Sequence, residues 1–210
     1  MLEGRCVVVT GASGNLGAAV CARLRRGGAQ VFEVDRAVAD VTDEAQVEHA
    51  YDAAQKKLGP IWGAVHCTGA WAGGLVAETP LATFEKMIAV NLRSTFLCCK
   101  AALKHIKEGR IVNVAAYGPA TFTGLGGNGA YAAAKAGVIA LTKAIAQESP
   151  HVRANCVAPG TMRTPQNAAG MPSADQGGWV PLEEVAEAIA WLLTPESGAA
   201  NGVVLTLPSR

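Results

Sequence analysis

Short apolar runs rich in β-branched residues alternate along the chain with longer stretches of helical character. The short runs predict buried strands, because β-branched residues favour a pleated, packed surface. These strands are expected at 5–10, 30–34, 61–66, 110–114, 152–157 and 202–207. The longer stretches predict helices at 15–26, 42–58, 129–148 and 181–193, and one long helix or two abutting helices over 83–106.

Continuous apolar strands that alternate with helices predict a parallel sheet covered on both faces. We therefore expect a single α/β domain over residues 1–210, with a doubly wound parallel sheet in three layers, α/β/α. The long irregular segments 115–128 and 159–180 each follow a predicted strand. Because ligands of such sheets bind at the carboxyl ends of the strands, these two segments are expected to form the pocket.

Composition and charge exclude several classes of protein. The net charge of +1 supplies no basic surface for nucleic acid, and no apolar run is long enough to span a membrane. The amino-terminal residues lack the pattern of a signal peptide, so we expect a cytoplasmic protein. The six cysteines and four histidines have no ligand spacing, and we interpret the cysteines as buried, reduced thiols rather than metal ligands.

A glycine-rich turn connects the first predicted strand to the first helix. It reads Thr-Gly-Ala-Ser-Gly-Asn-Leu-Gly over residues 10–17. Gly11 permits the tight turn, Gly14 lets the backbone approach a pyrophosphate, and Gly17 allows close helix packing. Since the turn lies between a strand and a helix, it predicts a dinucleotide site on a Rossmann fold.

Asp35 ends the second predicted strand, where a carboxylate can accept hydrogen bonds from the adenosine ribose. The same charge repels a 2′-phosphate, so we expect NAD(H) to be preferred, with NADP(H) possible because Arg36 can pair with a phosphate. The alternative for Asp35 is a solvated turn residue. Asp40 and Val41 follow what resembles a shortened strand and are placed to contact the adenine.

Tyr131 and Lys135 lie four residues apart at the start of an alanine-rich helix. This spacing puts the phenol and the ammonium on one helix face, about 6 Å apart. A fixed cation lowers the pKa of a tyrosine, so the pair is a candidate proton donor or acceptor for reduction or oxidation. A surface pair without function is the alternative.

Taken together, these motifs resemble the short-chain dehydrogenase/reductase family, in the family's order and over the whole chain. Further matching pieces are Val90-Asn91-Leu92 and Pro159-Gly160 followed by Thr164. The resemblance implies that Tyr131 is the catalytic acid/base, that Lys135 holds the nicotinamide ribose and lowers the tyrosine pKa, and that Asn91 anchors a water in a proton relay. It implies that Thr164 holds the nicotinamide carboxamide. The predicted cofactor-binding residues are Gly11, Ser13, Asn15, Leu16, Asp35, Arg36, Asp40, Val41, Gly69, Tyr131, Lys135, Pro159, Gly160 and Thr164.

Three positions depart from the family pattern. Asn15 replaces a glycine of the loop, and asparagine tolerates a left-handed backbone better than most residues. His66-Cys-Thr-Gly69 replaces Asn-Asn-Ala-Gly, so we expect the bracing of the sheet by asparagine to be lost. Ala115-Ala116 stands where members carry a serine that hydrogen-bonds the substrate carbonyl. Either Tyr117, Thr121 or Thr123 replaces it, or the substrate does not need it, or the protein is a poor carbonyl reductase.

The quinonoid dihydropteridine reductase branch of the family has the same gap. Local similarity to it covers residues 69–74, 105–109, 164–165, 171–175 and 179–183, whereas Asn91 follows the general family. We predict an NADH-dependent reductase of that type, in which an electron-poor ring accepts hydride with little polarisation. Trp71 offers a face for a bicyclic ring, or else is a core or lid residue, and Ala116 and Tyr117 are the other candidate substrate contacts.

Two alternatives remain open at this stage. One is a short-chain reductase or dehydrogenase of another small carbonyl or alcohol, and the other is a dinucleotide sensor with little chemistry. Trp179 is expected to pack in the lid or core, and Trp62 and Trp191 in the core. Small residues on the helices near His105 and after Gly129 predict close helix packing between subunits, hence a homodimer or homotetramer.

Overall fold

The computed structural model describes residues 2–210 and contains one six-stranded sheet, in the order β2-β1-β3-β4-β5-β6. Each neighbouring pair of strands is parallel. The strands are β1 (Cys6–Thr10), β2 (Gln30–Val34), β3 (Ile61–His66), β4 (Gly109–Val114), β5 (Val152–Pro159) and β6 (Val204–Leu207). The predicted fold class, a single α/β domain with a doubly wound parallel sheet, is confirmed.

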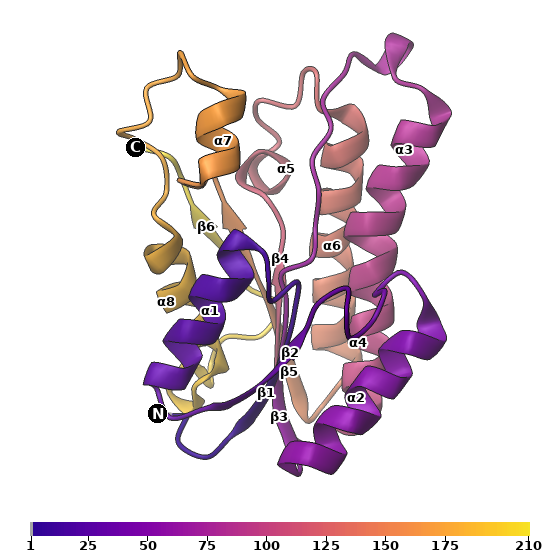
Figure 1. Cartoon of the computed structure of the whole chain (residues 1–210), viewed down its shortest axis with the longest axis vertical. Helices are drawn as coiled ribbons and strands as arrows, with labels where there is room; N and C mark the ends of the chain where they lie inside the picture. Colours follow the sequence, from indigo (N-terminus) through magenta and orange to yellow (C-terminus); the bar gives the residue numbers. More distant parts are fainter. Residues whose placement is uncertain (1) are drawn as a thin grey trace.

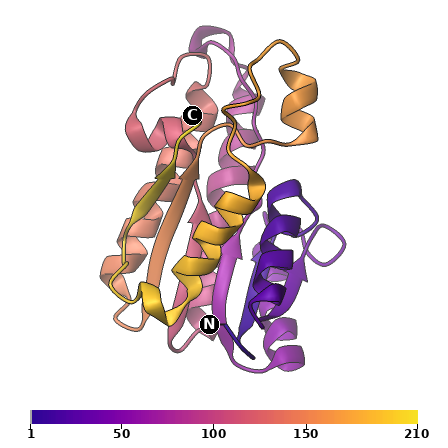
Figure 2. The ribbon, with the colours of Figure 1, turned by 90° about the vertical axis from the view of Figure 1, so that its left-hand side faces the viewer.

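Helices cover both faces of this sheet (Figures 1 and 2). One face carries α1 (Asn15–Arg26) and α8 (Leu182–Leu193), and the other carries α2 (Glu44–Leu58), α4 (Ser94–His105) and α6 (Gly129–Glu148). The two segments predicted to be irregular contain the short helices α5 (Tyr117–Thr121) and α7 (Pro165–Gly170). Both lie beyond the carboxyl ends of the strands, where the pocket was expected (Figure 1). Two short 3₁₀ turns, η1 (Val76–Glu78) and η3 (Pro195–Ser197), lie in the connections.

The one long helix or two abutting helices expected over 83–106 form a continuous rod of α3 (Leu81–Met87), a π-helical segment η2 (Ile88–Arg93) and α4. One segment differs from the predicted pattern. The shortened strand expected before Asp40 is absent from the described residues, because 35–39 form a turn in which Val38 N donates to Asp35 O at 3.0 Å. The Asp35 carboxylate also accepts from Ala37 N at 2.9 Å, which stabilises the turn.

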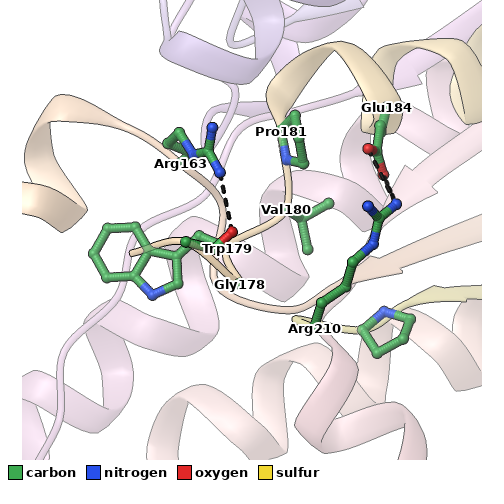
Figure 3. Close-up of a pocket in the computed structure, with 9 residues that line it drawn as sticks. Arg163, Gly178, Trp179, Val180, Pro181, Glu184 and Arg210 are labelled. Atoms are coloured by element: carbon green, nitrogen blue, oxygen red, sulfur yellow. Dashed lines mark hydrogen bonds and ion pairs between the residues drawn. The ribbon is translucent and has the colours of Figure 1, made fainter. Parts of the chain in front are cut away.

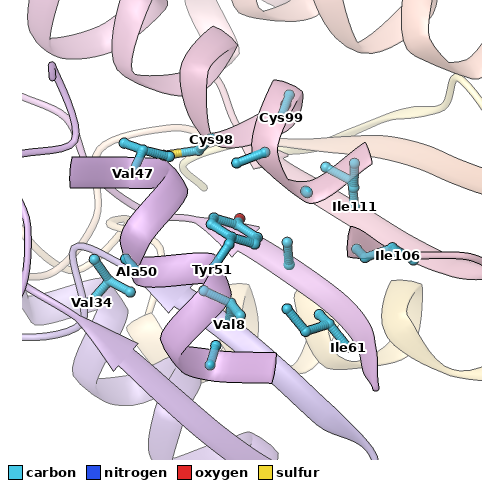
Figure 4. Packing of buried hydrophobic residues seen from close by; sticks show 14 of the residues in the cluster. Val8, Val34, Val47, Ala50, Tyr51, Ile61, Cys98, Cys99, Ile106 and Ile111 are labelled. Carbon is cyan, nitrogen blue, oxygen red and sulfur yellow. The ribbon is translucent and has the colours of Figure 1, made fainter. Parts of the chain in front are cut away.

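Two apolar clusters, one on each face, hold the helices to the sheet. Tyr51 of α2 lies in the middle of one cluster, with Val8 and Ile111 of the sheet and Cys98 of α4 around it (Figure 4). The prediction that Trp191 is a core residue is wrong, because it is 49% exposed on α8. The buried face of α8 is formed by neighbouring side chains such as Ile189 and Leu192, and not by the Trp191 ring.

A chain of buried hydrogen bonds joins the strands at the end of β3. His66 Nδ1 donates to Asn113 Oδ1 at 2.7 Å, so its Nε2 accepts from the Tyr51 hydroxyl at 3.0 Å. Asn113 Nδ2 then donates to Thr142 Oγ1 of α6 at 2.9 Å. Bracing by the family's asparagine is absent, as expected, but His66 takes its place and connects β3 to β4 and α2. Burial lowers the pKa of His66 to about 4 and keeps the ring neutral.

Candidate active site

The turn after β1 is built so that only glycine fits at two positions. Gly11 has a φ of +67°, and a Cβ there would meet Thr68 N at 2.7 Å. A Cβ on Gly17 would meet Gly11 O at 2.1 Å, so the start of α1 packs directly against the turn. These contacts fix the amino end of α1 over the carboxyl end of β1.

The residues around this turn fit the pyrophosphate of a dinucleotide. Ser13 and Gly14 are exposed, and no described side chain caps the first turn of α1. The backbone N–H groups there point to an anion site, helped by the helix dipole. The Leu16 side chain is buried in the core, so Leu16 offers only its N–H to a ligand, and Asn15 is half-buried at the edge.

The end of β2 presents the residues expected to meet the adenosine. Asp35 is half-buried there, and one of its carboxylate oxygens accepts from Ala37 N. Its other oxygen has no hydrogen bond within residues 2–210, which leaves it available to ribose hydroxyls, and Arg36 beside it is exposed. Asp40 is exposed, and its carboxylate accepts hydrogen bonds from the N–H and the hydroxyl of Thr42. These hydrogen bonds hold the pKa of Asp40 below its usual value. Val41 is buried in the core, so only its backbone can face an adenine.

Tyr131 and Lys135 share one face of α6, as the spacing predicted. Lys135 is 4% exposed, and its Nζ donates to the Val114 carbonyl at 2.8 Å. That Nζ lies 6.0 Å from the centre of the Tyr131 ring. Burial raises the pKa of Tyr131 to about 12 and lowers that of Lys135 to about 8. The predicted lowering of the tyrosine pKa is therefore wrong for the chain by itself, because burial of the phenol outweighs an ammonium turned toward β4.

Asn91 joins the π-helical segment to the loop after β3. It is fully buried, and its Nδ2 donates to Ala70 O at 2.9 Å and Met87 O at 3.0 Å. Its Oδ1 accepts from Ala70 N at 3.2 Å. A Cβ on Gly69 would meet Asn91 Oδ1 at 2.9 Å and Lys135 Nζ at 3.3 Å, so Gly69 keeps open the space next to both side chains. Asn91, Gly69 and Lys135 are thus brought together, and the water relay implied for Asn91 stays a prediction.

The substrate side of the site lacks a side-chain hydroxyl at the end of β4. Ala115 is buried and Ala116 precedes α5, which begins at Tyr117. The hydroxyls of Thr121 and Thr123 bond to each other at 2.7 Å, and Thr121 also donates to the Tyr117 carbonyl at 2.9 Å. These two groups are therefore engaged with each other and with the backbone of α5.

Trp71 lies in the loop after β3 and is 67% exposed. Its indole N–H donates to Asn128 Oδ1 at 2.9 Å, and its ring packs against Gly73, where a Cβ would meet it at 2.8 Å. The backbone of the same loop bonds to the segment before α6, through Gly74 N and Gly127 O at 2.7 Å. The tryptophan is thus an exposed side chain held in one orientation near the start of α6.

The segment after β5, residues 160–180, forms a lid over the carboxyl end of the sheet. Pro159 ends β5, and Gly160 N donates to Leu207 O at 2.8 Å. Thr164 is buried and caps α7, accepting from Asn167 N at 3.1 Å. At the base of the lid, Arg163 donates to Gly177 O at 3.2 Å, and Arg210 pairs with Glu184 at 3.2 Å (Figure 3).

Comparison with known proteins decides the family. A family model described as enoyl-(acyl carrier protein) reductase matches residues 2–207. The chain is 30% identical to 2-(R)-hydroxypropyl-CoM dehydrogenase of Xanthobacter autotrophicus, over 97% of this chain and 96% of that protein. The chain belongs to the short-chain dehydrogenase/reductase family. Members of this family use NAD(P)(H), and the protein is thus an oxidoreductase by family.

Two further relatives of this short-chain dehydrogenase/reductase are an inactive protein and a sugar dehydrogenase. It is 33% identical to the inactive 2-(S)-hydroxypropyl-CoM dehydrogenase 2 of Xanthobacter autotrophicus, over 80% of this chain and 81% of that protein. The ligand-free structure of Thermoplasma acidophilum aldohexose dehydrogenase matches with a TM-score of 0.90 at 26% identity, covering 99% of this chain and 94% of that one. The Rossmann-type architecture is therefore shared across relatives of different substrates.

Sequence analysis of this family member missed two asparagines that matter to the site. Asn128 holds Trp71, and Asn113 holds His66. Asn113 is polar within an apolar strand, a signal that points to a buried partner. Nothing local marks Asn128, because its partner lies 57 positions away in the sequence.

No helix among residues 2–210 has the length and apolar character that crossing a bilayer requires.

Proposed function

We propose that this protein is a cytoplasmic, NADH-dependent reductase that acts on a quinonoid dihydropteridine. The observation that carries the proposal is the pairing of an intact Tyr131 and Lys135 with alanine at the position of the substrate-binding serine. A ketone needs a hydrogen-bond donor on its oxygen, and loss of one such donor costs about 10²–10³-fold in rate. A conjugated, electron-poor imine accepts hydride with less help.

In this proposal the chain supplies orientation and one proton. A reduced nicotinamide dinucleotide would be held at its pyrophosphate by the turn after β1 and at its carboxamide by Thr164, and it would supply the hydride. Because its raised pKa keeps Tyr131 protonated at neutral pH, the phenol can donate its proton to the substrate nitrogen as the hydride arrives. The tyrosine then recovers a proton from solvent, and Lys135, fixed to Val114, positions the nicotinamide ribose beside it.

Trp71 supports a flat bicyclic substrate. Its ring is exposed, and the bonds to Asn128 and the packing on Gly73 hold it in place before any ligand binds. A planar ring can stack on such a face with little loss of side-chain freedom. Local similarity of residues 69–74, 171–175 and 179–183 to the dihydropteridine reductase branch supports the same substrate.

Two other functions have support. Similarity to 2-(R)-hydroxypropyl-CoM dehydrogenase favours a reductase or dehydrogenase of another small carbonyl or alcohol, in which Tyr117, Thr121 or Thr123 replaces the serine after a shift of α5. The inactive relative favours a dinucleotide sensor with little chemistry.

Turnover measurements separate these functions. Loss of NADH absorbance is followed with a quinonoid dihydropterin, generated by oxidation of its tetrahydropterin, and with a panel of small ketones. The proposal expects rapid turnover of the dihydropterin and slow turnover of the ketones. Efficient ketone reduction without dihydropterin turnover would overturn it, and NADH binding without turnover of either substrate would favour the sensor.

NADH rather than NADPH is the cofactor in this proposal. One carboxylate oxygen of Asp35 has no hydrogen bond within residues 2–210, and a 2′-phosphate next to this negative charge would be repelled. We expect a lower Kd for NADH than for NADPH by fluorescence titration, and Asp35→Ala should narrow the difference. Tighter binding of NADPH by the unaltered protein would contradict this preference.

We also propose a homodimer or homotetramer formed through α4 and α6. Phe96 of α4 is 49% exposed, and Ala133 and Ala140 leave the outer face of α6 smooth. Small side chains let helices of two subunits approach closely and bury such a phenylalanine. Sedimentation at micromolar concentration tests this: a monomer contradicts it, and Phe96→Glu should dissociate the assembly.

A further inference from the structure

One side-chain hydrogen bond crosses from the glycine-rich turn to the lid. Asn15 Nδ2 donates to Gln166 Oε1 at 2.8 Å, between residues 151 positions apart. Asn15 is the first residue of α1, at the position where the family pattern has glycine, and Gln166 is in the first turn of α7. Both views of the ribbon place α7 above the amino end of α1 (Figures 1 and 2).

The lid side of this hydrogen bond is braced by hydrogen bonds within the lid. Thr164 caps α7, and Asn167 Nδ2 donates to Met162 O at 2.8 Å. The two ends of the lid pair with each other, since Arg163 N donates to Val180 O and Val180 N to Thr161 O, each at 2.9 Å. The backbone that carries Gln166 is therefore held in place by hydrogen bonds.

The other side is equally constrained. Asn15 follows Gly14, whose N–H donates to Gly11 O at 3.0 Å, and the next residues enter α1. Two braced pieces of backbone thus meet through a single pair of amide side chains. The exposed Ser13 and Gly14 of the glycine-rich turn directly precede Asn15, and the buried Thr164 lies two residues before Gln166.

We propose that Asn15 and Gln166 form a clasp that closes over the pyrophosphate of the bound dinucleotide and sets how long the cofactor stays. The proposal rests on the proposed function only in requiring that a nicotinamide dinucleotide binds this turn. Both are positioning residues: they hold the lid against the phosphate turn, and the hydrogen bond between them opens when the cofactor leaves. A glycine at position 15 has no side chain to make this bond, so the clasp is a consequence of the Asn15 departure.

The size of the effect follows from the kind of bond. A neutral hydrogen bond exposed to water contributes modestly, since water competes for both partners. We therefore expect loss of the clasp to speed NADH dissociation by about two- to tenfold. The association rate constant should rise by no more than the same factor, because the same bond has to open for the cofactor to enter.

Stopped-flow displacement of NADH by excess NAD⁺ measures this dissociation directly. The variants are Asn15→Gly, Gln166→Ala and the double variant, with Ser173→Ala as the matched control. Ser173 is exposed on the same lid and makes no side-chain hydrogen bond within residues 2–210. The clasp predicts that each single variant releases NADH faster, that the double variant is no faster than the quicker single variant, and that Ser173→Ala matches the unaltered protein.

Several results would overturn the clasp. One is an unchanged dissociation rate in both single variants, and another is a double variant whose acceleration equals the product of the two single effects. An equal acceleration in Ser173→Ala would show that any change in the lid has this effect, which also contradicts the clasp. If the unaltered protein binds neither NADH nor NADPH, the proposed function fails and the clasp fails with it, whereas binding with unchanged release rates refutes the clasp alone.

Discussion

The ends of β3 and β4 depart from the family pattern in opposite ways. At the end of β3, His66 stands where the family has asparagine, and it bonds to Asn113 at 2.7 Å and Tyr51 at 3.0 Å. At the end of β4, Ala116 stands where the family has serine, and the hydroxyls of Thr121 and Thr123 are bonded to each other. One lost side chain has been replaced by new partners, and the other has not.

The difference follows from what each position must do. Bracing a sheet requires only that buried polar groups find partners, and several side chains can meet that need. Polarising a reacting atom requires a donor at one point in space, and a hydroxyl a few residues away on another turn does not occupy it. The β3 end thus tolerates substitution, while the β4 end changes which substrates can react.

Tyr131→Phe provides the largest test of this comparison. If no hydroxyl replaces the serine, Tyr131 is the principal proton donor, and its loss should lower kcat by about 10³–10⁴-fold. NADH turnover with the preferred substrate measures the loss. The Kd for NADH is the control and should change little, because the phenol is not required to hold the dinucleotide. Retention of more than a tenth of the rate would show that another donor, such as Tyr117, acts in its place.

His66→Ala tests the other half of the comparison. The substitution leaves a cavity and removes the partners of Asn113 and Tyr51, so we expect the free energy of unfolding to fall by about 4 kcal/mol. Urea denaturation measures it. His66→Asn, which restores the family residue, should lose less than half as much. A loss below about 1 kcal/mol for His66→Ala would mean that the hydrogen-bonded chain does not brace the sheet.

The buried histidine also makes stability depend on pH. The pKa of His66 is about 4 in the folded protein against 6.5 for the free side chain, so between these values the unfolded chain binds the extra proton. The stability that rests on neutral His66 is complete above pH 6.5 and is lost as pH falls toward 4, by about 3 kcal/mol. Urea denaturation of the protein and of His66→Asn across this range isolates the effect, which the variant should lack. Equal slopes in the two proteins would contradict it.

Local patterns in the sequence were sufficient for the scaffold. The strands at β2 and β3 and the helices α1 and α6 have the predicted bounds, because apolar runs and glycine stops are properties of neighbouring residues. Side-chain environments were harder to predict. The role of His66, the exposure of Trp191 and the raised pKa of Tyr131 depend on residues that meet only after folding. The sequence predicts candidate site residues where a motif fixes their spacing. It does not predict their pKa values or their exposure, which depend on the folded surroundings.

Ala116→Ser gives the smallest and most specific prediction. A serine hydroxyl at the start of α5 would supply the donor that ketones require, so kcat/KM for a small ketone should rise about tenfold, less than the full value because the surrounding residues were not selected to orient it. A dihydropterin, which needs less polarisation, should change by less than about twofold. Ala115→Ser at the buried neighbour is the matched control and should not activate ketone reduction. A tenfold gain for both substrates would mean that the missing hydroxyl limits all reduction by this protein, so that the absence of serine no longer distinguishes an imine from a carbonyl. An unchanged kcat/KM for both substrates would mean that another group already takes the place of the serine hydroxyl. The ends of β3 and β4 would then be alike, because each would have a substitute for the family's side chain.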